Sequence, residues 1–171
     1  MNIVAAAKVI NEMLKENVIE NYALGGALAV TFYTEPIATQ DVDIFFQIRA
    51  AKNTLAVLSP IYDYLTRKGY KTKAEHIIIE DLPVQFLPVF NDLTNEAVEA
   101  ANDFELEDTT IRVMSPEHLA AIMLDTGRTK DYLRIDMFVR NDLIDFGKLE
   151  TILQRHELSA KWKTNKYRLG L

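Results

Sequence analysis

The sequence contains no cysteine, three histidines, one tryptophan and no long apolar run. Without thiols the chain forms no disulfide, no thiolate zinc site and no cysteine nucleophile, so any metal is expected on carboxylates. His76, His118 and His156 have no metal-site spacing and are expected at the surface or as satisfied core residues. No window approaches the roughly 20 apolar residues of a membrane helix, and the N-terminus lacks the pattern of a secretion signal. We therefore expect a soluble cytoplasmic protein without membrane contact.

The composition is that of an ordinary globular chain, with 171 residues, 49% hydrophobic residues, 26% charged residues and a net charge of −6. The charge is unevenly distributed. Residues 1–110 carry 8 Lys and Arg against 17 Asp and Glu, a net of −9, whereas residues 111–171 carry 11 against 8, a net of +3. An acidic front and a basic rear could face each other across a site for a metal and a polyanion, or the basic residues could form a solvated tail.

The front of the chain alternates helical and strand patterns. We predict helices over 3–19 and 27–33, strands over 22–24 and 41–48, and a turn at Gly25-Gly26. Asn53 and then Ser59-Pro60 indicate two successive helix starts. Further on we expect a hairpin of residues 76–80 and 84–89, a helix capped by Thr94, and a strand pair at 104–106 and 111–113. The aromatic residues Phe45, Phe46, Phe86 and Phe90 fit a sheet core better than an exposed base-stacking platform.

The rear of the chain contains no convincing strand. After Ser115-Pro116, a cap followed by proline at the first helical position, residues 117–126, 129–140 and 146–155 have helical spacing. We therefore predict an α+β protein with an α/β domain over residues 1–113, followed by a small helical portion over residues 114–171 that packs against it.

Two short motifs of the front half combine into one candidate site. Asp41 and Asp43 flank Val42, so the period of a strand places both carboxylates on one face, where Mg²⁺ is the expected partner. Gly25-Gly26 ends a strand 15 residues upstream, where backbone N–H groups can meet phosphate oxygens. Taken singly, a solvated strand end and a tight turn are the alternatives. In this order the motifs fit transfer of a nucleotidyl group.

These motifs resemble the signature of a known superfamily. Ala23–Val30 followed by Thr39–Ile44 is similar to the nucleotidyltransferases with the DNA polymerase beta-like fold. Glu117–Ile122 and Gly127–Arg134 resemble the helical part of the abortive-infection nucleotidyltransferase toxin branch. The resemblance spans residues 22–135 and implies a mixed sheet flanked by helices, a Mg²⁺ cofactor and a nucleoside triphosphate substrate.

The resemblance also assigns roles to the residues of the front motifs. It implies that Gly25 and Gly26 approach the triphosphate, and that the catalytic residues Asp41 and Asp43 bind Mg²⁺. Family members place a third carboxylate on the strand after the hairpin, where this chain has Gln85. An amide neither carries charge nor accepts a proton near neutral pH. Among the neighbouring acids, Glu80 or Asp81 is a candidate to replace it.

The rear motif is expected to supply positive charge. The resemblance implies that Lys130 meets a nucleotide phosphate, and that Asp131 lies near the attacking group or orients a basic residue. Arg128 and Arg134 would add charge to the same nucleotide-binding cleft, with Arg134 four positions beyond Lys130 on the same face. A solvated helix face with ordinary ion pairs is the alternative.

Two functions follow from these expectations. The first is transfer of a nucleoside monophosphate from a triphosphate to an acceptor hydroxyl on RNA, a protein or a small molecule, with release of pyrophosphate. The second, motivated by Gln85, is a catalytically degenerate nucleotide-binding or toxin–antitoxin-type regulatory protein, with a protein partner or a homodimer as its context. A blander alternative is an α/β domain whose acids are surface features.

Overall fold

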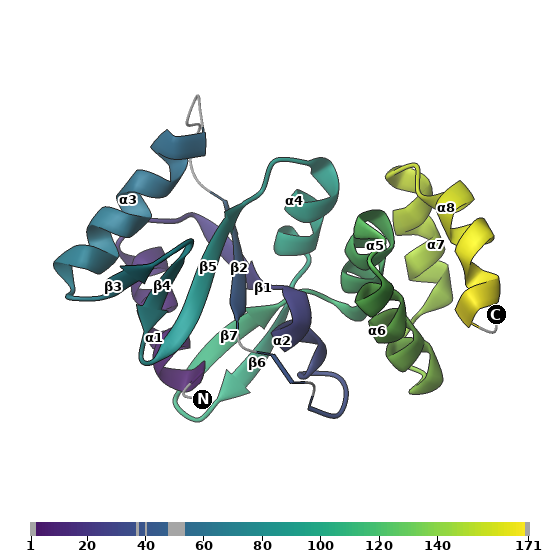
Figure 1. Cartoon of the computed structure of the whole chain (residues 1–171), viewed down its shortest axis with the longest axis horizontal. Helices are drawn as coiled ribbons and strands as arrows, with labels where there is room; N and C mark the ends of the chain where they lie inside the picture. The colour runs from purple at the N-terminus through teal and green to yellow at the C-terminus, as the bar shows by residue number, and fades with distance from the viewer. Residues whose placement is uncertain (1–2, 37, 40, 48–53, 170–171) are drawn as a thin grey trace.

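In the computed structural model, which describes residues 3–36, 38–39, 41–47 and 54–169, the chain folds into a seven-stranded sheet with helices on both faces (Figure 1). The strands are β1 (Asn21–Leu24), β2 (Val42–Gln47), β3 (Lys71–Lys73), β4 (His76–Ile79), β5 (Leu82–Pro88), β6 (Asn102–Leu106) and β7 (Thr109–Val113). The helices are α1 (Ile3–Lys15), α2 (Gly26–Val30), α3 (Thr54–Arg67), α4 (Asp92–Glu99), α5 (Pro116–Thr126), α6 (Thr129–Arg140), α7 (Phe146–Arg155), α8 (Ser159–Asn165) and the 3-10 helix η1 (Lys166–Leu169).

The sheet is mixed, with the strand order β3-β4-β5-β2-β1-β7-β6. Strand β2 runs parallel to β5 and β1 runs parallel to β7, whereas the other neighbours are antiparallel. All seven strands precede Met114, and every later element of the described chain is helical. The predicted α+β fold with a mixed sheet and a helical rear portion is therefore confirmed, while its division into two domains stays a prediction.

Strand β2 determines which face of the sheet carries the predicted site. Its buried side chains are those of Val42, Ile44 and Phe46, and those of Asp43, Phe45 and Gln47 alternate with them. Phe46 lies opposite Tyr22, whose hydroxyl donates to Asn11 of α1 at 2.9 Å, so α1 covers the buried face. Gln47 donates to Asn95 of α4 at 2.6 Å, so α4 lies on the other face. That face, which carries Asp43, is the one turned towards the C-terminal helices (Figure 1).

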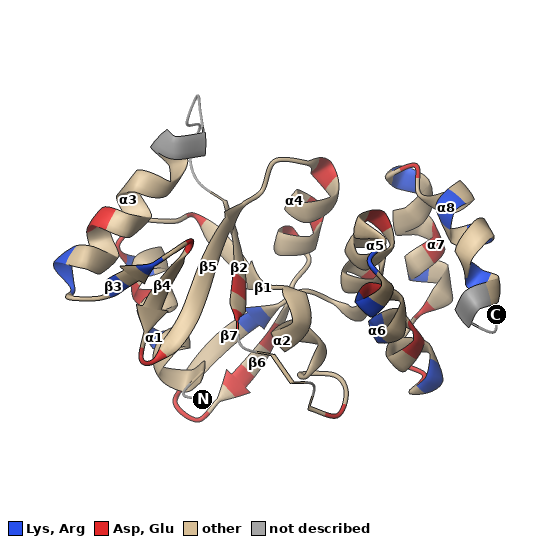
Figure 2. Cartoon of the chain, in the orientation of Figure 1, with Lys and Arg blue, Asp and Glu red and all other residues tan. Residues whose placement is uncertain are grey.

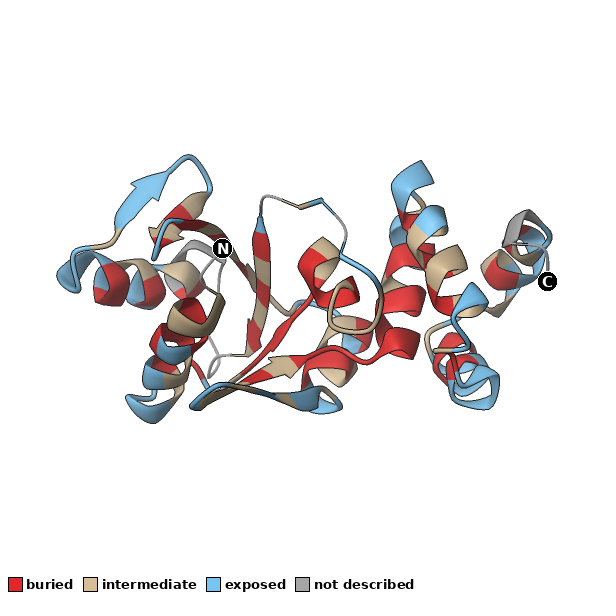
Figure 3. Cartoon of the chain, turned by 90° about the horizontal axis from the view of Figure 1, so that it is seen from below, coloured by how far each residue is buried: buried red, intermediate tan, exposed pale blue. Residues whose placement is uncertain are grey.

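Helix α5 joins the helical portion to the sheet. Ser115 caps its N-terminus through the backbone N–H of His118, Pro116 takes the first helical position, and Gly127 ends it with φ of +72°. Buried residues continue from the sheet along α5 (Figure 3), and α5 contacts α2, α4, α6, α7 and α8. The sheet and the C-terminal helices thus share one hydrophobic core.

Helix α3 differs from the sequence prediction, because it passes through Pro60 without a break. A proline inside a helix removes one backbone hydrogen bond. Val57, Ile61 and Leu65 recur at helical spacing and are all buried, so packing of one continuous apolar face outweighs that loss. The expected cap at Asn53 lies outside the described residues.

The segment around α4 also corrects two expectations. Asn91 caps this helix, since its side chain accepts from the backbone N–H of Thr94 at 2.8 Å, so Thr94 lies in the first turn and is not the cap. Phe90 was expected in the core, but 67% of it is exposed, because it lies in the short link between β5 and α4.

Three further elements were not predicted. Strand β3 is short and fully exposed, so it has no apolar pattern that would predict it. Its strand conformation is stabilised by backbone pairing with β4. Helix α8 and η1 occupy the segment that was considered as a solvated basic tail, and α8 is anchored by the buried side chains of Trp162 and Asn165. None of the helices in the described ranges is long and apolar enough to span a membrane.

Candidate nucleotide site

The Gly25-Gly26 turn lies directly against Asp43. The backbone N–H of Gly25 donates to the carbonyl oxygen of Asp43 at 2.9 Å. Gly26 has φ of +61°, a left-handed conformation that side chains rarely adopt, and a Cβ added to it would lie 1.8 Å from Asp43 Oδ2. Glycine is therefore required here for two separate reasons, its backbone conformation and the close approach of the carboxylate.

Asp43 and Asp41 lie near each other at the start of β2 but differ in exposure. Burial raises the pKa of Asp43, and the charge of Asp41 raises it further, whereas His76, Arg128 and Arg134 act in the opposite direction. Asp41 lies just before the strand, and 55% of its side chain is exposed; its Oδ1 is 3.7 Å from His76 Nε2. The two carboxylates are thus close enough to repel each other.

Gln85 occupies the strand position next to Asp43. The parallel register of β2 and β5 pairs Asp43 with Gln85. Glu80 and Asp81 lie in the tight turn between β4 and β5, both with positive φ, and Glu80 accepts a hydrogen bond from the Tyr70 hydroxyl. That turn precedes Leu82, which lies three residues before Gln85. Roughly 10 Å of strand therefore separates the two acids from the position of Gln85 beside Asp43.

A cavity of about 210 Å³ lies between the sheet and the C-terminal helices. The sheet side contributes Gly26, Asp43, Phe45, Gln85 and Leu87. The helical side contributes apolar residues of α5 and the polar residues Arg128, Asp131 and Arg134. Neither portion of the chain makes this cavity alone, so its shape depends on how α5 and α6 pack against the sheet.

Asp131 holds the two arginines of the helical wall. Its side chain is completely buried, and it accepts from Arg128 Nε at 2.7 Å and from Arg134 Nη1 at 3.4 Å. The hydrogen bond to Asp131 raises the pKa of Arg128. Of the two expected positions for Asp131, the one that orients basic residues matches this geometry. The arginines face the carboxylate of Asp43, whose pKa both of them lower.

Lys130 lies outside the cavity that Arg128, Asp131 and Arg134 line, and it is exposed. Arg134 was expected to share its face, but Arg134 turns to Asp131, three residues earlier on α6. Basic positions recur along α6, α7 and α8 (Figure 2), so the positive charge of the rear half extends over three helices and beyond the cavity.

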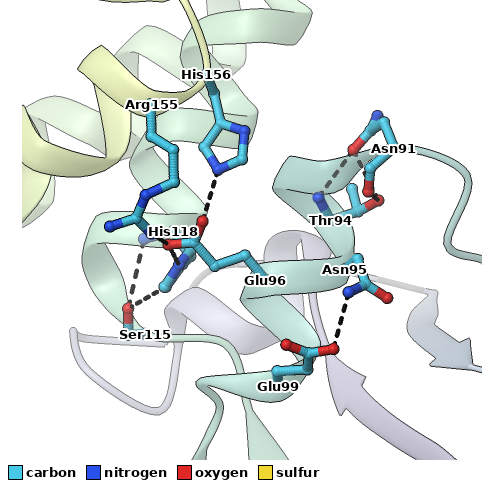
Figure 4. Close-up of polar contacts among 9 residues, drawn as sticks. All are labelled: Asn91, Thr94, Asn95, Glu96, Glu99, Ser115, His118, Arg155 and His156. Atoms are coloured by element: carbon cyan, nitrogen blue, oxygen red, sulfur yellow. Dashed lines mark hydrogen bonds and ion pairs between the residues drawn. The ribbon is translucent and has the colours of Figure 1, made fainter.

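Sequence reasoning missed a polar cluster on the other side of α5. Glu96 of α4 accepts from Arg155 and from His156 Nε2 at 2.7 Å, and His118 Nε2 lies 3.3 Å from it (Figure 4). Ser115 contacts the other ring nitrogen of His118 at 2.9 Å. Burial raises the pKa of Glu96, but the Arg155, His156 and His118 hydrogen bonds outweigh it and lower the pKa to about 2. Both histidines thus have polar partners, as expected of satisfied residues, where α4 meets the C-terminal helices.

The donor set around Asp43 fits a cation that is shared with a ligand. In the described part of the chain, no three carboxylate or imidazole groups gather tightly enough to hold a metal by themselves. Mg²⁺ is commonly held by one or two carboxylates together with substrate phosphates. Because the close charges of Asp41 and Asp43 repel each other, a cation beside them would be favoured. The two carboxylates therefore fit Mg²⁺ that arrives with phosphate ligands.

Comparisons with known proteins agree with this arrangement at the level of the fold. No family model and no curated protein matches the sequence. An antigenic nucleotidyltransferase-like protein from Paracoccidioides brasiliensis superposes with a TM-score of 0.56 at 16% identity, over 92% of this chain and 90% of that one. The solution structure of the antibiotic-resistance factor ANT(2'')-Ia superposes with a TM-score of 0.50 at 13% identity, over 98% of both chains. Its crystal structure with adenylyl-2''-tobramycin gives 0.50 at 15%, over 92% and 98%.

The agreement is a superposition over nearly the whole chain. The low identities limit this agreement to architecture. The chain has the nucleotidyltransferase fold.

Proposed function

We propose that the chain is a nucleotidyltransferase that transfers a nucleoside monophosphate from a nucleoside triphosphate to an acceptor hydroxyl. The observation that carries the proposal is the cavity in which Gly26 and Asp43 on one wall face Arg128 and Arg134 on the other. Such a cavity offers the carboxylate of Asp43 for a cation on one side, and cationic donors for phosphate oxygens on the other.

Each wall has a separate task in this proposal. Asp41 and Asp43 hold Mg²⁺, and Gly25 and Gly26 allow the triphosphate to approach the backbone without a side chain in the way. The guanidinium groups of the helical wall bind phosphate oxygens, which their planar geometry suits. Asp131 keeps these groups in place. For Lys130, the proposed contact with a phosphate is supported only by the sequence resemblance.

The proposed reaction breaks one bond and forms one. The acceptor oxygen attacks the α-phosphorus, the bond from that phosphorus to the bridging oxygen of the β-phosphate breaks, and pyrophosphate leaves with the electron pair. Mg²⁺, when bound, supplies charge stabilisation at the phosphates. Because Gln85 cannot accept the hydroxyl proton, we propose that the proton passes to water in the open cleft. Arg128 and Arg134 stabilise the charge that develops on the leaving group.

A binding experiment tests the first step. Each of ATP, CTP, GTP and UTP is titrated calorimetrically into the protein with Mg²⁺, and into the variants Asp43→Asn and Asp142→Asn, the second being an exposed acid that does not line the cavity. We expect at least one nucleotide to bind to the wild type and to Asp142→Asn, and to be lost in Asp43→Asn. Absence of binding by all four, or equal binding by Asp43→Asn, contradicts the proposal.

A second function is favoured by one observation, the amide of Gln85 at the position paired with Asp43. We propose as the alternative that the chain binds a nucleotide without transferring it. Radiolabel from α-³²P-labelled triphosphates separates the two functions. Label transfer to RNA, protein or small-molecule acceptors by the wild type supports transfer, whereas label transfer only by Gln85→Asp supports a degenerate binding protein. The adenylylated tobramycin bound by ANT(2'')-Ia makes an aminoglycoside a reasonable acceptor to include.

A further inference from the structure

The last two elements of the chain carry an excess of positive charge. Residues 159–169, which form α8 and η1, contain three lysines, one arginine and no Asp or Glu. The buried side chains of Trp162 and Asn165 anchor α8, so this charge is held in place and is not that of a solvated tail. Within the described ranges, Lys163 and Lys166 form no ion pair with an acidic side chain. These two lysines are therefore available to an anion from outside.

Lys161 brings the same charge to the edge of the cavity. Its Nζ donates to the backbone carbonyl of Asp125 and lies 3.7 Å from the position of a Cβ added to Gly127. Gly127 ends α5 and directly precedes Arg128, which lines the cavity. Helix η1 contacts α6, the helix that begins at this corner. Positive charge thus continues from the cavity wall to α8 (Figure 2).

Tyr167 adds an exposed aromatic ring to these cations. It is 78% exposed and directly follows Lys166. Lys163 precedes Tyr167 by four positions, the spacing of neighbours on one helical face, and is also exposed. Unlike the buried phenylalanines of the sheet, this ring has both properties of a base-stacking platform, namely exposure and basic neighbours. We call Lys161, Lys163, Lys166 and Tyr167 the rear basic surface.

The chemistry of the rear basic surface favours one class of ligand. A single-stranded nucleic acid offers phosphates to lysines and base faces to an aromatic ring at the same time. A duplex keeps its base faces stacked inside, and an acidic peptide has no base to stack on the ring. An aminoglycoside is itself a polycation, so the lysines repel it.

We propose that the acceptor of the transfer reaction is the 3′-hydroxyl end of a single-stranded nucleic acid, which the rear basic surface binds and leads to the cavity. This inference rests on the proposed function, which supplies the nucleoside triphosphate. The 3′ oxygen of the strand forms the new bond to the α-phosphorus, pyrophosphate leaves with the electron pair of the broken bond, and the hydroxyl proton passes to water. The strand is then one nucleotide longer.

A binding experiment uses the full chain and a 5′-fluorescent oligonucleotide of roughly 12 nucleotides, prepared as single-stranded RNA, as single-stranded DNA and as the duplex of each. Fluorescence anisotropy gives the affinity at a series of salt concentrations. We expect Lys163→Gln, Lys166→Gln to weaken single-strand binding about tenfold or more and to reduce the salt slope by roughly 1.4, because two phosphate contacts are lost. Tyr167→Ala should weaken it about fivefold or more, and the duplexes should bind less tightly than the single strands.

Two control variants separate a specific surface from general charge. Lys71→Gln, Lys73→Gln makes the same change of charge on the exposed edge strand β3, at the far end of the sheet from the C-terminal helices (Figure 1). This variant should bind the strand as the wild type does. Tyr167→Phe keeps the ring and should restore the affinity that Tyr167→Ala loses. Thermal unfolding of each variant checks that the fold is intact.

A transfer experiment then tests the acceptor role. Each single strand is incubated with the protein, Mg²⁺ and α-³²P-labelled triphosphates, and the products are separated on a denaturing gel. We expect label at the 3′ end of the RNA, the DNA or both, which identifies the sugar that the site accepts. A strand with a 3′-deoxy end should stay unlabelled. The two variants of the rear basic surface should raise the KM for the strand and leave calorimetric binding of the triphosphate unchanged.

The outcomes separate this inference from the proposed function. Triphosphate binding that Asp43→Asn abolishes, with strand affinity unchanged in both variants of the rear basic surface or lowered equally by the β3 variant, overturns the inference and leaves the proposed function intact. A strand that binds but never receives label, or label that appears only on an aminoglycoside or a protein, also overturns the inference alone. Absence of triphosphate binding overturns both.

Discussion

The carboxylate of Asp43 occupies the space that a side chain on Gly26 would need, since its Oδ2 lies 1.8 Å from the position of an added Cβ. This contact joins two motifs that are 17 residues apart in the sequence. The backbone bond from Gly25 to the Asp43 carbonyl fixes the same two segments from the strand side. The turn and the carboxylate are therefore one structural unit, and a change in either one alters the other.

Gly26→Ala should lower the free energy of unfolding by more than the strain of a positive φ alone would. The positive φ costs about 1–2 kcal/mol for a residue with a Cβ, and the overlap with Asp43 adds roughly 1–3 kcal/mol. Gly69→Ala is the matched control, because Gly69 has φ of +91° and nothing within 4 Å of an added Cβ. Urea unfolding should show the larger loss in Gly26→Ala, and only that variant should lose metal-dependent nucleotide binding. Equal losses in the two variants would contradict the close contact.

The buried carboxylate of Asp131 should be among the most sensitive positions of the helical wall. Asp131→Ala leaves Arg128 and the mostly buried Arg134 without their partner, and breaking a buried pair costs about 3–5 kcal/mol. Asp136→Ala on the same helix removes the pair with Arg140, whose side chain is 76% exposed, and should cost less than about 1 kcal/mol. Denaturant unfolding measures both. Similar losses from the two variants would show that Asp131 does not anchor the arginines.

Glu96 should make stability depend on acid pH. Its pKa in the folded chain is about 2, below the ordinary 4.5, so its contribution is complete above pH 4.5 and is lost as the pH falls towards 2. Near neutral pH, Glu96→Gln should lower the free energy of unfolding by roughly 1.5–3 kcal/mol, because charge-assisted bonds to Arg155, His156 and His118 are weakened.

The signature of this cluster is the convergence of two curves. The difference in stability between the wild type and Glu96→Gln should shrink steadily between pH 4.5 and the acid limit of folding, as urea unfolding at a series of pH values would show. Glu150→Gln, an exposed change on α7, should give a curve parallel to the wild type. A difference between wild type and Glu96→Gln that stays constant with pH would rule out the ion-pair origin.

Local patterns of the sequence were sufficient for most elements of the fold. The alternation in Val42–Phe46 and the cap, proline and terminal glycine of α5 are short-range signals, and the structure uses them as expected. The continuous α3 could not be predicted from Pro60, because the apolar face that outweighs the lost hydrogen bond is satisfied only by tertiary packing. Asn91 could have been identified as a cap, since asparagine is a strong N-cap residue.

The non-local contacts of the site were harder to predict. His76 and Asp41 are 35 residues apart, and their proximity depends on the parallel pairing of β2 with β5, which no local pattern specifies. Glu96 of α4, His118 of α5 and His156, the C-cap of α7, converge for the same reason. The pairs of Asp131 with Arg128 and Arg134 are different, because both have the i,i+3 spacing of helix neighbours and were readable from the sequence.

The arginines and Lys130 should contribute unequally to nucleotide binding. Arg134 lines the cavity and is held by Asp131, whereas Lys130 is exposed outside it. A charge-assisted hydrogen bond is worth roughly 1.5–3 kcal/mol, so Arg134→Ala should weaken nucleotide binding about 10- to 100-fold. Exposed charges at a distance are screened by salt, so Lys130→Ala should have a much smaller effect that disappears at high ionic strength. Calorimetric titration of both variants at two salt concentrations measures this order; a larger, salt-independent loss in Lys130→Ala would place the phosphates at Lys130 instead.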